Sequence, residues 1–451
     1  MKRLLTSRAL SYLRFFAKKA LAKHQPTVIG VAGSVGKSST RNAIEAILKD
    51  HFPTKSVGNS ETGIPLGILG MKPENYTKLD WAKMLLKSPF NLNFLQGTKY
   101  LIAEMGIDEP DPPKNMGYLL TILKPHIAVS LNVSATHSLQ FDKTLSDNRN
   151  ALSEEERLKL IIQKIAEEDT KIITKSQCAI GIYNTDDEYV SEQIKSKTPT
   201  STKLLSFGTK NSCDISYGLY KVSLKGTSFA FYVKTEDKRE EVTVNFPRFI
   251  LPREYREVFA AAILVGLQTG LTLEQIKASL EKNYVLPKGR SSLFSGINNT
   301  MIIDSTYNAS KASISTFLDL VDTLKKETDR PVTLLLGDMR ELGEESKIEH
   351  EEVAVKLIGI VDYLYLVGPL TREYVLPVVQ LNESLFKEIR WFDTSIRAGE
   401  FMKENLVKNS IVLAKGSQNT IFLEEAVKQI LADKNDRKNL CRQEEFWKKE
   451  K

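Results

Sequence analysis

Residues 28–40 read Val28-Ile29-Gly30-Val31-Ala32-Gly33-Ser34-Val35-Gly36-Lys37-Ser38-Ser39-Thr40. An apolar, β-branched run leads into a turn flanked by two glycines, and a helix-permissive segment, Arg41 to Leu48, follows. This order predicts a strand, a phosphate-binding loop and a helix, because the backbone N–H groups of such a turn converge on an anion at the helix N-terminus. The alternative is an ordinary glycine turn before Lys-Ser, which the flanking strand and helix patterns disfavour.

The loop matches a shortened Walker A motif. Gly33 and Gly36 let the backbone approach a phosphate, Lys37 supplies a charge for the β- and γ-phosphates, and the Ser38 hydroxyl suits Mg²⁺. We therefore expect the nucleotide phosphates to be held by Gly33, Ser34, Val35, Gly36, Lys37, Ser38 and Ser39.

The amino-acid composition indicates which class of protein this chain belongs to. The chain has 451 residues, 41% hydrophobic and 26% charged, which is typical of a soluble globular protein with about three domains. Its net charge of +7 is mild for this size and charges of both signs are interspersed, so a nucleic-acid partner is not expected, whereas anionic substrates are compatible. Three scattered cysteines indicate a reducing cytoplasm, and no apolar run reaches the ~18 residues that span a bilayer.

The first residues form a basic amphipathic pattern. Apolar residues recur at near-helical spacing through residues 1–23, with lysines and arginines between them. The apolar run is too interrupted for a secretory signal. A basic helix lying on an anionic membrane surface remains open, but we favour a helix packed on the first domain.

The rest of the chain alternates strand and helix patterns. Buried strands are predicted at 99–106, which ends near Glu104, at 126–132, which leads to His137, and at 179–184. Residues 138–168 are predicted helical, 203–246 form a β-rich appendage, and helices follow at 253–269 and 272–281. Strands at 300–304, 332–336, 363–367 and 411–414 belong to a second α/β unit.

These patterns predict an α/β fold with four segments. Residues 1–25 form the basic helix, and 26–286 form a phosphate-loop central domain with a parallel sheet and helices on both faces. Residues 287–433 form a C-terminal Rossmann-like domain, and 434–451 form a charged tail that is frayed or a surface helix.

Several motifs, in the right order over roughly residues 26–432, resemble those of the Mur ligases, ATP-dependent amide-forming enzymes of peptidoglycan precursor synthesis. The phosphate loop matches their short form, and the other matching segments are Asn59–Leu66, Ala103–Gly106, Asn132–His137, Pro287–Arg290 and Ala414–Ser417. Asp304–Ala309 and Gly337–Gly343, the latter followed by His350, are similar to motifs of the D-alanyl-D-alanine-adding branch.

The resemblance implies an ATP- and Mg²⁺-dependent ligase, with a role in cell-wall biogenesis and cell shape. It would add D-alanyl-D-alanine to a muramyl-tripeptide precursor through an acyl phosphate. Lys37, His137 and Asp169 would be catalytic, and Ser38, Glu104, His137 and Asp169 would hold magnesium. Arg290 and Asp304 would contact the nucleotide. The substrate-lining residues would be Asn59, Glu61, Asn308, Asp338, Glu341 and Lys415.

Each of these residues has an ordinary alternative role. Glu104 could form a salt bridge, and His137 could be a hydrogen-bonded loop residue. Asp169, beside Glu167 and Glu168, could lie on a solvated helix face. Arg290 and Asp304 could form an ion pair, and the turn residues could be structural.

The chain departs from the family pattern at three places. Only the basic helix precedes the loop, where relatives carry a domain that grips the uridine nucleotide, so a lipid-linked acceptor is conceivable. Asp169 aligns with a lysine that is carbamylated in relatives, and its carboxylate could replace the carbamate. Arg253–Val258 stands where relatives have an H-N-x-x-N-A helix, so base contacts must differ.

Three alternatives to the ligase follow. They are a folylpolyglutamate-like amide ligase, a catalytically silent nucleotide-binding scaffold, and a membrane-surface assembly factor recruited by residues 1–23. We expect a cytoplasmic monomer that acts on small-molecule substrates.

Overall fold

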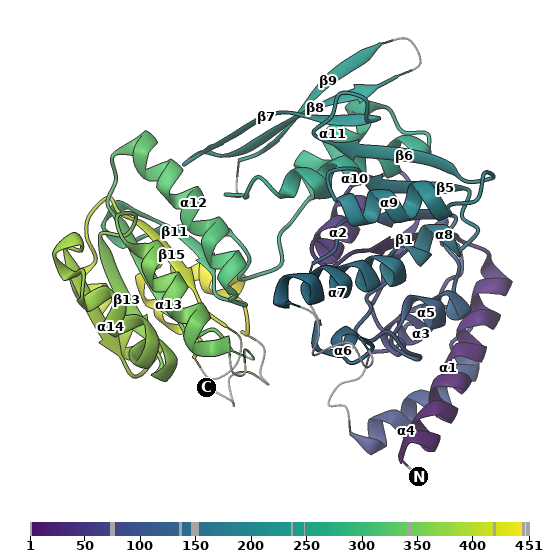
Figure 1. Cartoon of the computed structure of the whole chain (residues 1–451), viewed down its shortest axis with the longest axis horizontal. Coiled ribbons are helices and arrows are strands. Elements are labelled where there is room, and N and C mark those ends of the chain that lie inside the picture. Colours follow the sequence, from purple (N-terminus) through teal and green to yellow (C-terminus); the bar gives the residue numbers. More distant parts are fainter. Residues whose placement is uncertain are drawn as a thin grey trace. The chain divides into compact units, whose positions relative to one another are not determined.

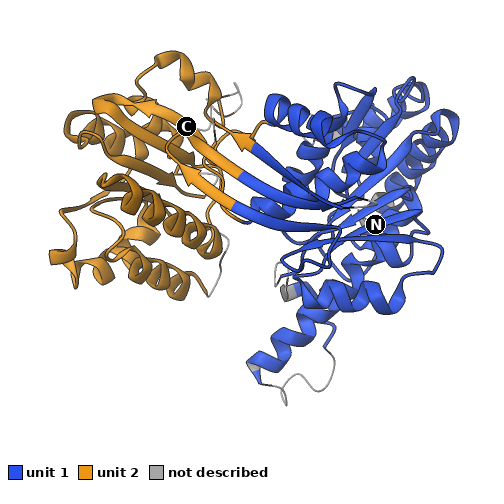
Figure 2. Cartoon of the chain, turned by 90° about the horizontal axis from the view of Figure 1, so that it is seen from above, with its two compact units in different colours: residues 1–219, 229–244, 254–284 blue, residues 220–228, 245–253, 285–451 orange. Residues whose placement is uncertain are grey.

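The computed structural model describes residues 2–72, 77–134, 138–145, 153–235, 238–247, 249–340, 342, 345–417, 421–443 and 447. These residues form two compact units, shown in blue and orange in Figure 2. Unit 1 comprises residues 1–219, 229–244 and 254–284, and unit 2 comprises residues 220–228, 245–253 and 285–451. In the part of the chain that the structure describes, no helix is both long and apolar enough to cross a membrane.

Unit 1 is built around a mixed sheet (Figure 1). Its strands are β1 (Thr27–Ala32), β2 (Thr54–Val57), β3 (Tyr100–Glu104), β4 (Ile127–Ser130), β5 (Ile180–Asn184), β6 (Lys203–Gly208), β7 (Ile215–Ser223), β8 (Gly226–Lys234) and β9 (Arg239–Phe246), and the last three each have part of their length in unit 2. Its helices are α1 (Lys2–His24), α2 (Lys37–Leu48), α3 (Gly63–Ile68), α4 (Lys78–Lys87), α5 (Met116–Ile122), α6 (Ser138–Asp142), α7 (Glu154–Asp169), α8 (Lys171–Thr174), α9 (Glu188–Lys197), α10 (Tyr255–Gln268) and α11 (Leu273–Asn283), with the 3₁₀ turn η1 (Ser88–Phe90) after α4.

The sheet order is β2-β3-β1-β4-β5-β6-β7-β8-β9. Every pair from β2 to β7 is parallel, so the carboxyl ends of β1, β3 and β4 lie at one edge. Helices α2, α10 and α11 pack together on one face, and α5, α7, α8 and α9 pack together on the other. The predicted helices on both faces are therefore present, and the phosphate loop lies where β1 meets α2.

The β-rich segment 203–246 extends this sheet. Because β6 pairs in parallel with β5, and β7 with β6, it continues the central sheet. The predicted β-rich segment is therefore present, as a continuation of the central sheet. The predicted helix over 138–168 is described as two helices, α6 and α7.

Helix α1 packs on unit 1. Leu10, Leu13, Ala17 and Ala20, at helical spacing, are buried. The favoured interpretation of residues 1–23 as a packed helix is therefore confirmed for its apolar face.

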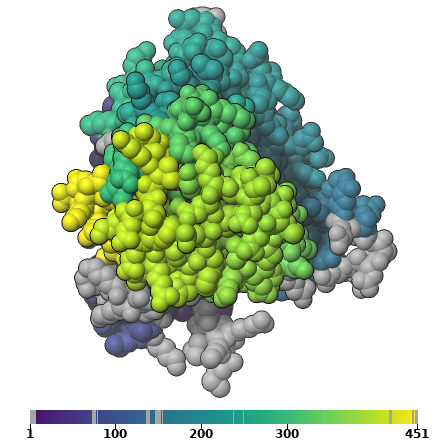
Figure 3. All heavy atoms as spheres, turned by 90° about the vertical axis from the view of Figure 1, so that its left-hand side faces the viewer, coloured from purple at the N-terminus to yellow at the C-terminus, as the bar shows by residue number. Residues whose placement is uncertain are grey.

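Unit 2 contains a six-stranded sheet in the order β10-β11-β15-β12-β13-β14. The strands are β10 (Ser292–Gly296), β11 (Thr300–Ser305), β12 (Val332–Gly337), β13 (Tyr363–Val367), β14 (Glu388–Phe392) and β15 (Ile411–Lys415). The helices are α12 (Lys311–Thr328), α13 (Ser346–Leu357), α14 (Leu376–Gln380), α15 (Ser395–Asn405) and α16 (Glu424–Ile430), and short turns are η3 (Ile297–Asn299), η5 (Thr371–Val375), η6 (Glu383–Leu385) and η7 (Lys434–Asn439). Figure 3 shows one face of this unit, a surface of green to yellow atoms.

Both faces of this sheet are covered. Leu334 and Leu336 of β12 join the core under α12 and α13, whereas Leu335 joins the core under α15 and α16. β11 and β15 alternate in the same way. Successive strand residues point to opposite faces, so this alternation is that of a sheet buried on both sides.

The prediction that residues 434–451 form a frayed tail or a surface helix was wrong in part. Leu440, Cys441 and Arg442, which follow η7, are buried in unit 2 and are not a frayed or surface segment. A buried arginine needs charged and carbonyl partners, and its partners are described below.

Candidate functional site

The phosphate loop depends on backbone that only glycine adopts easily. Gly33 has φ +138° and Gly36 has φ +90°. A Cβ added at Gly33 would lie 2.9 Å from the Leu131 Cβ, so the loop passes too close to the end of β4 for a side chain.

Asn132, directly after this strand region, holds the loop. Its carbonyl accepts from the Ser34 N–H at 2.7 Å, and its side-chain oxygen accepts from the Val35 N–H at 3.0 Å. Its amide nitrogen donates to Glu257 Oε2 at 3.0 Å. Burial raises the pKa of Glu257, although the Asn132 bond opposes this.

In the sequence Asn132 stands out only as part of a motif, and Glu257 was not predicted as a site residue. Glu257 lies in the first turn of α10, within the segment that departs from the family pattern. The available signal for Glu257 was an acidic residue directly before the apolar, alanine-rich part of α10.

Lys37 lies folded back over the loop. Its Nζ donates to the Gly33 carbonyl at 2.5 Å and to the Ser34 carbonyl at 3.2 Å. A Cβ at Gly106 would lie 3.6 Å from the Lys37 Cε, and the Gly106 N–H donates to the Asn59 carbonyl at 3.0 Å. The predicted substrate segment around Asn59 therefore lies beside the lysine.

Ser38 and Glu104 meet at the edge of the sheet. The Ser38 hydroxyl lies 2.9 Å from each oxygen of Glu104, and Arg41 Nη1 lies 3.2 Å from Glu104 Oε2. Glu104 is buried at the carboxyl end of β3. The salt-bridge alternative for Glu104 is thus present, together with the predicted pairing with Ser38.

Asp169 is buried in the same site. Its side chain is only 1% exposed, so the solvated-face alternative is wrong. Burial raises its pKa to about 7, against the opposing effects of the Lys37 charge and a hydrogen bond from the Gly33 N–H. Its Oδ1 is buried without a hydrogen-bond partner, which leaves an acceptor for a ligand of this site.

The Ser38 hydroxyl and the carboxylates of Glu104 and Asp169 are the types of oxygen ligand that suit a magnesium ion. Hydroxyl and carboxylate oxygens are the ligands that Mg²⁺ prefers, and it keeps several water or phosphate ligands. Among the described residues, no group of three or more His, Cys, Asp or Glu side chains is placed so that it could hold a metal ion. His137 lies outside the described residues.

The two predicted substrate residues before α3 differ in exposure. Asn59 is exposed, and Glu61 is partly buried at the start of α3. Between them, Ser60 Oγ accepts from the Gly63 N–H at 3.0 Å, which fixes the entry to the helix.

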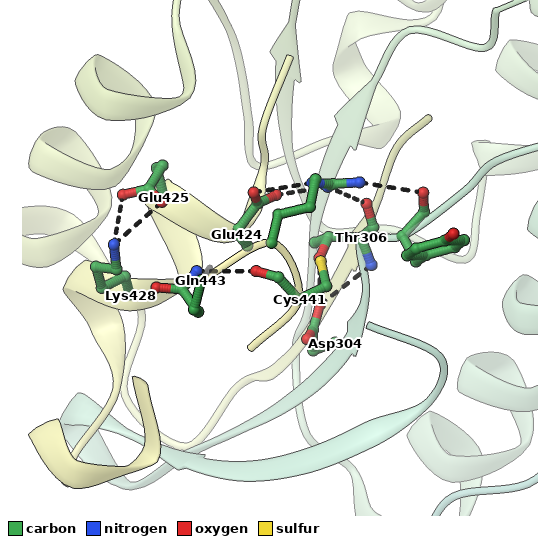
Figure 4. A network of polar contacts seen from close by, with 9 residues as sticks. Asp304, Thr306, Glu424, Glu425, Lys428, Cys441 and Gln443 are labelled. Atoms are coloured by element: carbon green, nitrogen blue, oxygen red, sulfur yellow. Dashed lines mark hydrogen bonds and ion pairs between the residues drawn. The ribbon is translucent and has the colours of Figure 1, made fainter. Parts of the chain in front are cut away.

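A second polar cluster lies in unit 2 at the carboxyl end of β11 (Figure 4). Asp304 is fully buried, and its Oδ1 accepts from the Thr306 N–H at 3.1 Å and the Thr306 hydroxyl at 2.7 Å. Its Oδ2 has no partner, and burial raises its pKa to about 6.

Arg442 closes this cluster. Its Nε and Nη2 donate to the two oxygens of Glu424 at 2.9 and 2.6 Å, and Nη2 also donates to the Thr306 carbonyl at 2.8 Å. The Cys441 Sγ lies 3.4 Å from the Thr306 hydroxyl, and burial raises the pKa of Cys441 to about 12. The Arg442–Glu424 pair was not predicted, because the composition of the tail gives no sign of burial.

Lys415, at the end of β15, is also buried. Its Nζ donates to the Asn308 carbonyl at 2.6 Å and to the Ser305 hydroxyl at 3.2 Å. Burial lowers its pKa to about 7, helped by the charge of Arg290 and opposed by Asp304. The predicted residues Arg290, Asp304, Asn308 and Lys415 are therefore gathered at one edge of the unit 2 sheet.

Asp338 lies at the end of β12 and caps the segment after β13. Its carboxylate accepts from the Thr371 N–H at 2.9 Å, and burial raises its pKa. His350 Nε2 lies 3.0 Å from the Met339 N–H, and Nδ1 lies 2.6 Å from the Ser346 carbonyl, which assigns the neutral tautomer. Glu341 lies outside the described residues.

Comparison with known families matches two segments of the chain. Residues 31–153 match the Mur ligase middle domain, and residues 289–418 match the Mur ligase, glutamate ligase domain. The first match contains the phosphate loop and Glu104, and the second contains Asp304, Asp338 and Lys415.

Individual proteins are similar over most of the chain. A UDP-N-acetylmuramoyl-tripeptide–D-alanyl-D-alanine ligase of Rickettsia prowazekii is 25% identical, over 89% of this chain and 78% of its own. MurF ligase from Thermotoga maritima, solved in complex with ADP, is 22% identical with a TM-score of 0.65, covering 93% of this chain and 83% of its own. The apo form of L. casei FPGS is 15% identical with a TM-score of 0.61 and covers 94% of each chain.

Proposed function

Because this chain belongs to the Mur ligase family, we propose that it is an ATP-dependent ligase that adds D-alanyl-D-alanine to a muramyl-tripeptide precursor of peptidoglycan. The observation that carries the proposal is the phosphate loop with Lys37 folded over it and the Ser38–Glu104 pair beside it. The relatives named UDP-N-acetylmuramoyl-tripeptide–D-alanyl-D-alanine ligase support the substrate assignment.

The reaction proposed is amide formation in two steps. The precursor carboxylate attacks the γ-phosphorus of ATP, which forms an acyl phosphate and releases ADP. The free amine of the dipeptide then attacks the acyl carbon, loses a proton, and expels inorganic phosphate. Both steps move charge between oxygens, so the site needs cations and N–H donors.

The residues of unit 1 would supply them. The loop N–H groups and Lys37 would bind the β- and γ-phosphates when Lys37 exchanges the Gly33 and Ser34 carbonyls for phosphate oxygens. Asn132 would keep the loop in shape through Val35.

Ser38, Glu104 and Asp169 would hold magnesium. When bound, Mg²⁺ neutralises charge on the phosphate oxygens. The unpartnered Oδ1 of Asp169 supports its place in this set, in the role of the carbamylated lysine of relatives. His137 is proposed with it from the motif alone.

In unit 2 the cluster at the strand ends would serve the dipeptide and nucleotide. Lys415 would donate a hydrogen bond to a carboxylate, and Asp304, with its unpartnered Oδ2, would accept one from a hydroxyl or amine. Arg290 is exposed and lies 5.0 Å from the centre of the Tyr307 ring, where it could meet a phosphate. Asn308 is exposed beside them.

A second candidate is a folylpolyglutamate-like ligase. Its support is that the chain and the L. casei protein cover each other almost completely. Asp304–Ala309 and Gly337–Gly343 favour the D-alanyl-D-alanine reaction instead.

The test is ADP release with Mg²⁺-ATP, a muramyl-tripeptide nucleotide and D-alanyl-D-alanine, with each component omitted in turn. Turnover that requires all three components and is lost in Lys37→Ala supports the proposal. Turnover with a folate and L-glutamate would support the second candidate. ATP binding without turnover on either set would indicate the silent scaffold. The domain boundaries at 25, 286 and 433, a monomeric state and a cytoplasmic location are proposed with this function.

A further inference from the structure

One lobe of unit 1 carries an unusual concentration of positive charge. Residues 2–24 contain seven Lys or Arg and no acidic residue, and residues 77–99 contain four Lys and one Asp. Together the two segments carry ten net positive charges, more than the +7 of the whole chain. The rest of the protein is therefore slightly acidic, and its positive charge is concentrated here.

The two segments form one structural element, which we call the basic lobe (residues 2–24 and 77–99). Helix α1 packs against α4 and η1, and α1 and α4 lie side by side in Figure 1. Lys23 Nζ donates to Asn93 Oδ1 at 2.7 Å, and the His24 ring lies 2.9 Å from the Leu92 carbonyl.

Helix α4 has two apolar sides. Met84, with Trp81 and Leu85, packs inward against Leu13 of α1. Leu79, Leu86 and Phe90 lie on the other side and are 65%, 72% and 84% exposed. Positions 79, 83, 86 and 90 follow helical spacing, because α4 continues into η1 through residues with helical dihedral angles.

Lysines flank this outward stripe. Lys83 lies within it, and Lys83, Lys87 and Lys72 line a hollow of about 300 Å³ beside α4. The one acid of the segment, Asp80, also lines the hollow, and its carboxylate accepts from the Thr77 N–H at 3.2 Å in the cap of α4.

We propose that the basic lobe docks on a lipid bilayer that contains anionic lipids, with Leu79, Leu86 and Phe90 entering the headgroup–acyl boundary and the lysines contacting lipid phosphates. Large apolar side chains beside lysines on one helix suit this surface, because the acyl boundary of the bilayer accepts the apolar groups and the anionic headgroups attract the lysines. A nucleic acid would use the lysines but leave the leucines in water. The proposal concerns a lobe outside the phosphate loop and goes beyond the ligase function.

The test is co-sedimentation of the full chain with vesicles of phosphatidylcholine, alone or mixed with phosphatidylglycerol. We expect binding to the mixed vesicles only, and loss of binding at high salt. Lys83→Gln and Lys87→Gln should each lower the partition constant by about fivefold, which corresponds to about 1 kcal/mol per lysine. The triple variant Leu79→Gln/Leu86→Gln/Phe90→Gln should lower it at least about tenfold.

The matched control is Leu381→Gln/Leu385→Gln, which removes side chains in unit 2 that are 87% and 56% exposed. It should sediment like the unmodified chain. The proposal would be overturned if the triple variant sedimented with the mixed vesicles as strongly as the unmodified chain does. It would also be overturned if the unmodified chain did not bind vesicles that contain phosphatidylglycerol. Binding to a soluble RNA that falls with the lysine variants but not with the triple variant would overturn it as well. ATP turnover on soluble substrates should be unchanged in all of these variants, which separates this test from that of the ligase.

Discussion

Arg442 and Glu424 form a two-point ion pair in the interior of unit 2, with N–O distances of 2.9 and 2.6 Å and side chains only 2% and 0% exposed. The same guanidinium donates to the carbonyls of Thr306 and Tyr307, at 2.8 and 3.3 Å. The segment after η7 is therefore an integral part of the site around Asp304 (Figure 4).

Arg442→Met should destabilise unit 2 by about 3–5 kcal/mol, because it leaves the Glu424 carboxylate buried without its cation. Urea unfolding followed by circular dichroism measures this. Arg437→Met, an exposed arginine five residues earlier, should have almost no effect. Equal midpoints for the two variants would mean that the pair does not hold the segment. The double variant Arg442→Met/Glu424→Leu should recover much of the loss, because no charge is then left buried.

Asp169→Asn should lower turnover about 10²- to 10³-fold and raise the Mg²⁺ concentration needed for half-maximal rate, because the buried Oδ1 would lose its charge. The steady-state rate against Mg²⁺ at saturating ATP measures this. Glu167→Gln, on the exposed side of α7, is the control. An unchanged Mg²⁺ dependence would remove Asp169 from the metal set.

Asn132→Ala should weaken ATP binding by about 1–2 kcal/mol, because the Val35 N–H and Glu257 would each lose a partner. Calorimetric titration with ADP gives the affinity. Asn91→Ala, which removes one bond to the Leu69 carbonyl away from the loop, should leave the affinity unchanged. If both variants bind ADP alike, Asn132 does not order the loop.

Lys415 predicts a pH dependence of stability. Its pKa is lowered to about 7 in the folded protein, whereas an unfolded lysine titrates near 10.4. Between these values the unfolded state binds more protons, so Lys415 adds stability as pH rises from 7 toward 10, by up to about 1.4 kcal/mol per pH unit. Below pH 7 the buried charge destabilises the fold.

The measurement compares Lys415→Met with the unmodified chain in urea at pH 7 and pH 9. The difference in unfolding free energy should shift in favour of the unmodified chain at pH 9. Lys408→Met, an exposed lysine nearby in sequence, should show no such shift. A constant difference for Lys415→Met would show that its pKa is not lowered.

The sequence predicted the strands and the phosphate loop well. Runs such as 99–106 and 332–336 are apolar on both faces and end at glycine or acid, and they became β3 and β12 because parallel strands are buried on both sides. The glycines and lysine of the loop are local features, so they were readable without the fold. Glu104 was named because an acid at a strand end is also visible locally, whereas Asp304 was named from the family resemblance of its motif.

Contacts between distant segments were not predictable. Asn132 meets Glu257, and Arg442 meets Glu424 and Thr306, only because strand order brings the chain back to the same sheet edge. The exposed stripe of α4 depends on α1 covering its other side.

By itself the sequence determined an α/β chain with a phosphate loop and the family that its motifs resemble, since these depend on local spacing. The tertiary structure decided which charges are buried. It buried Asp169, for which a solvated helix face was the alternative, and residues 440–442 of the charged tail, because burial depends on what packs over a residue and not on its neighbours in the chain.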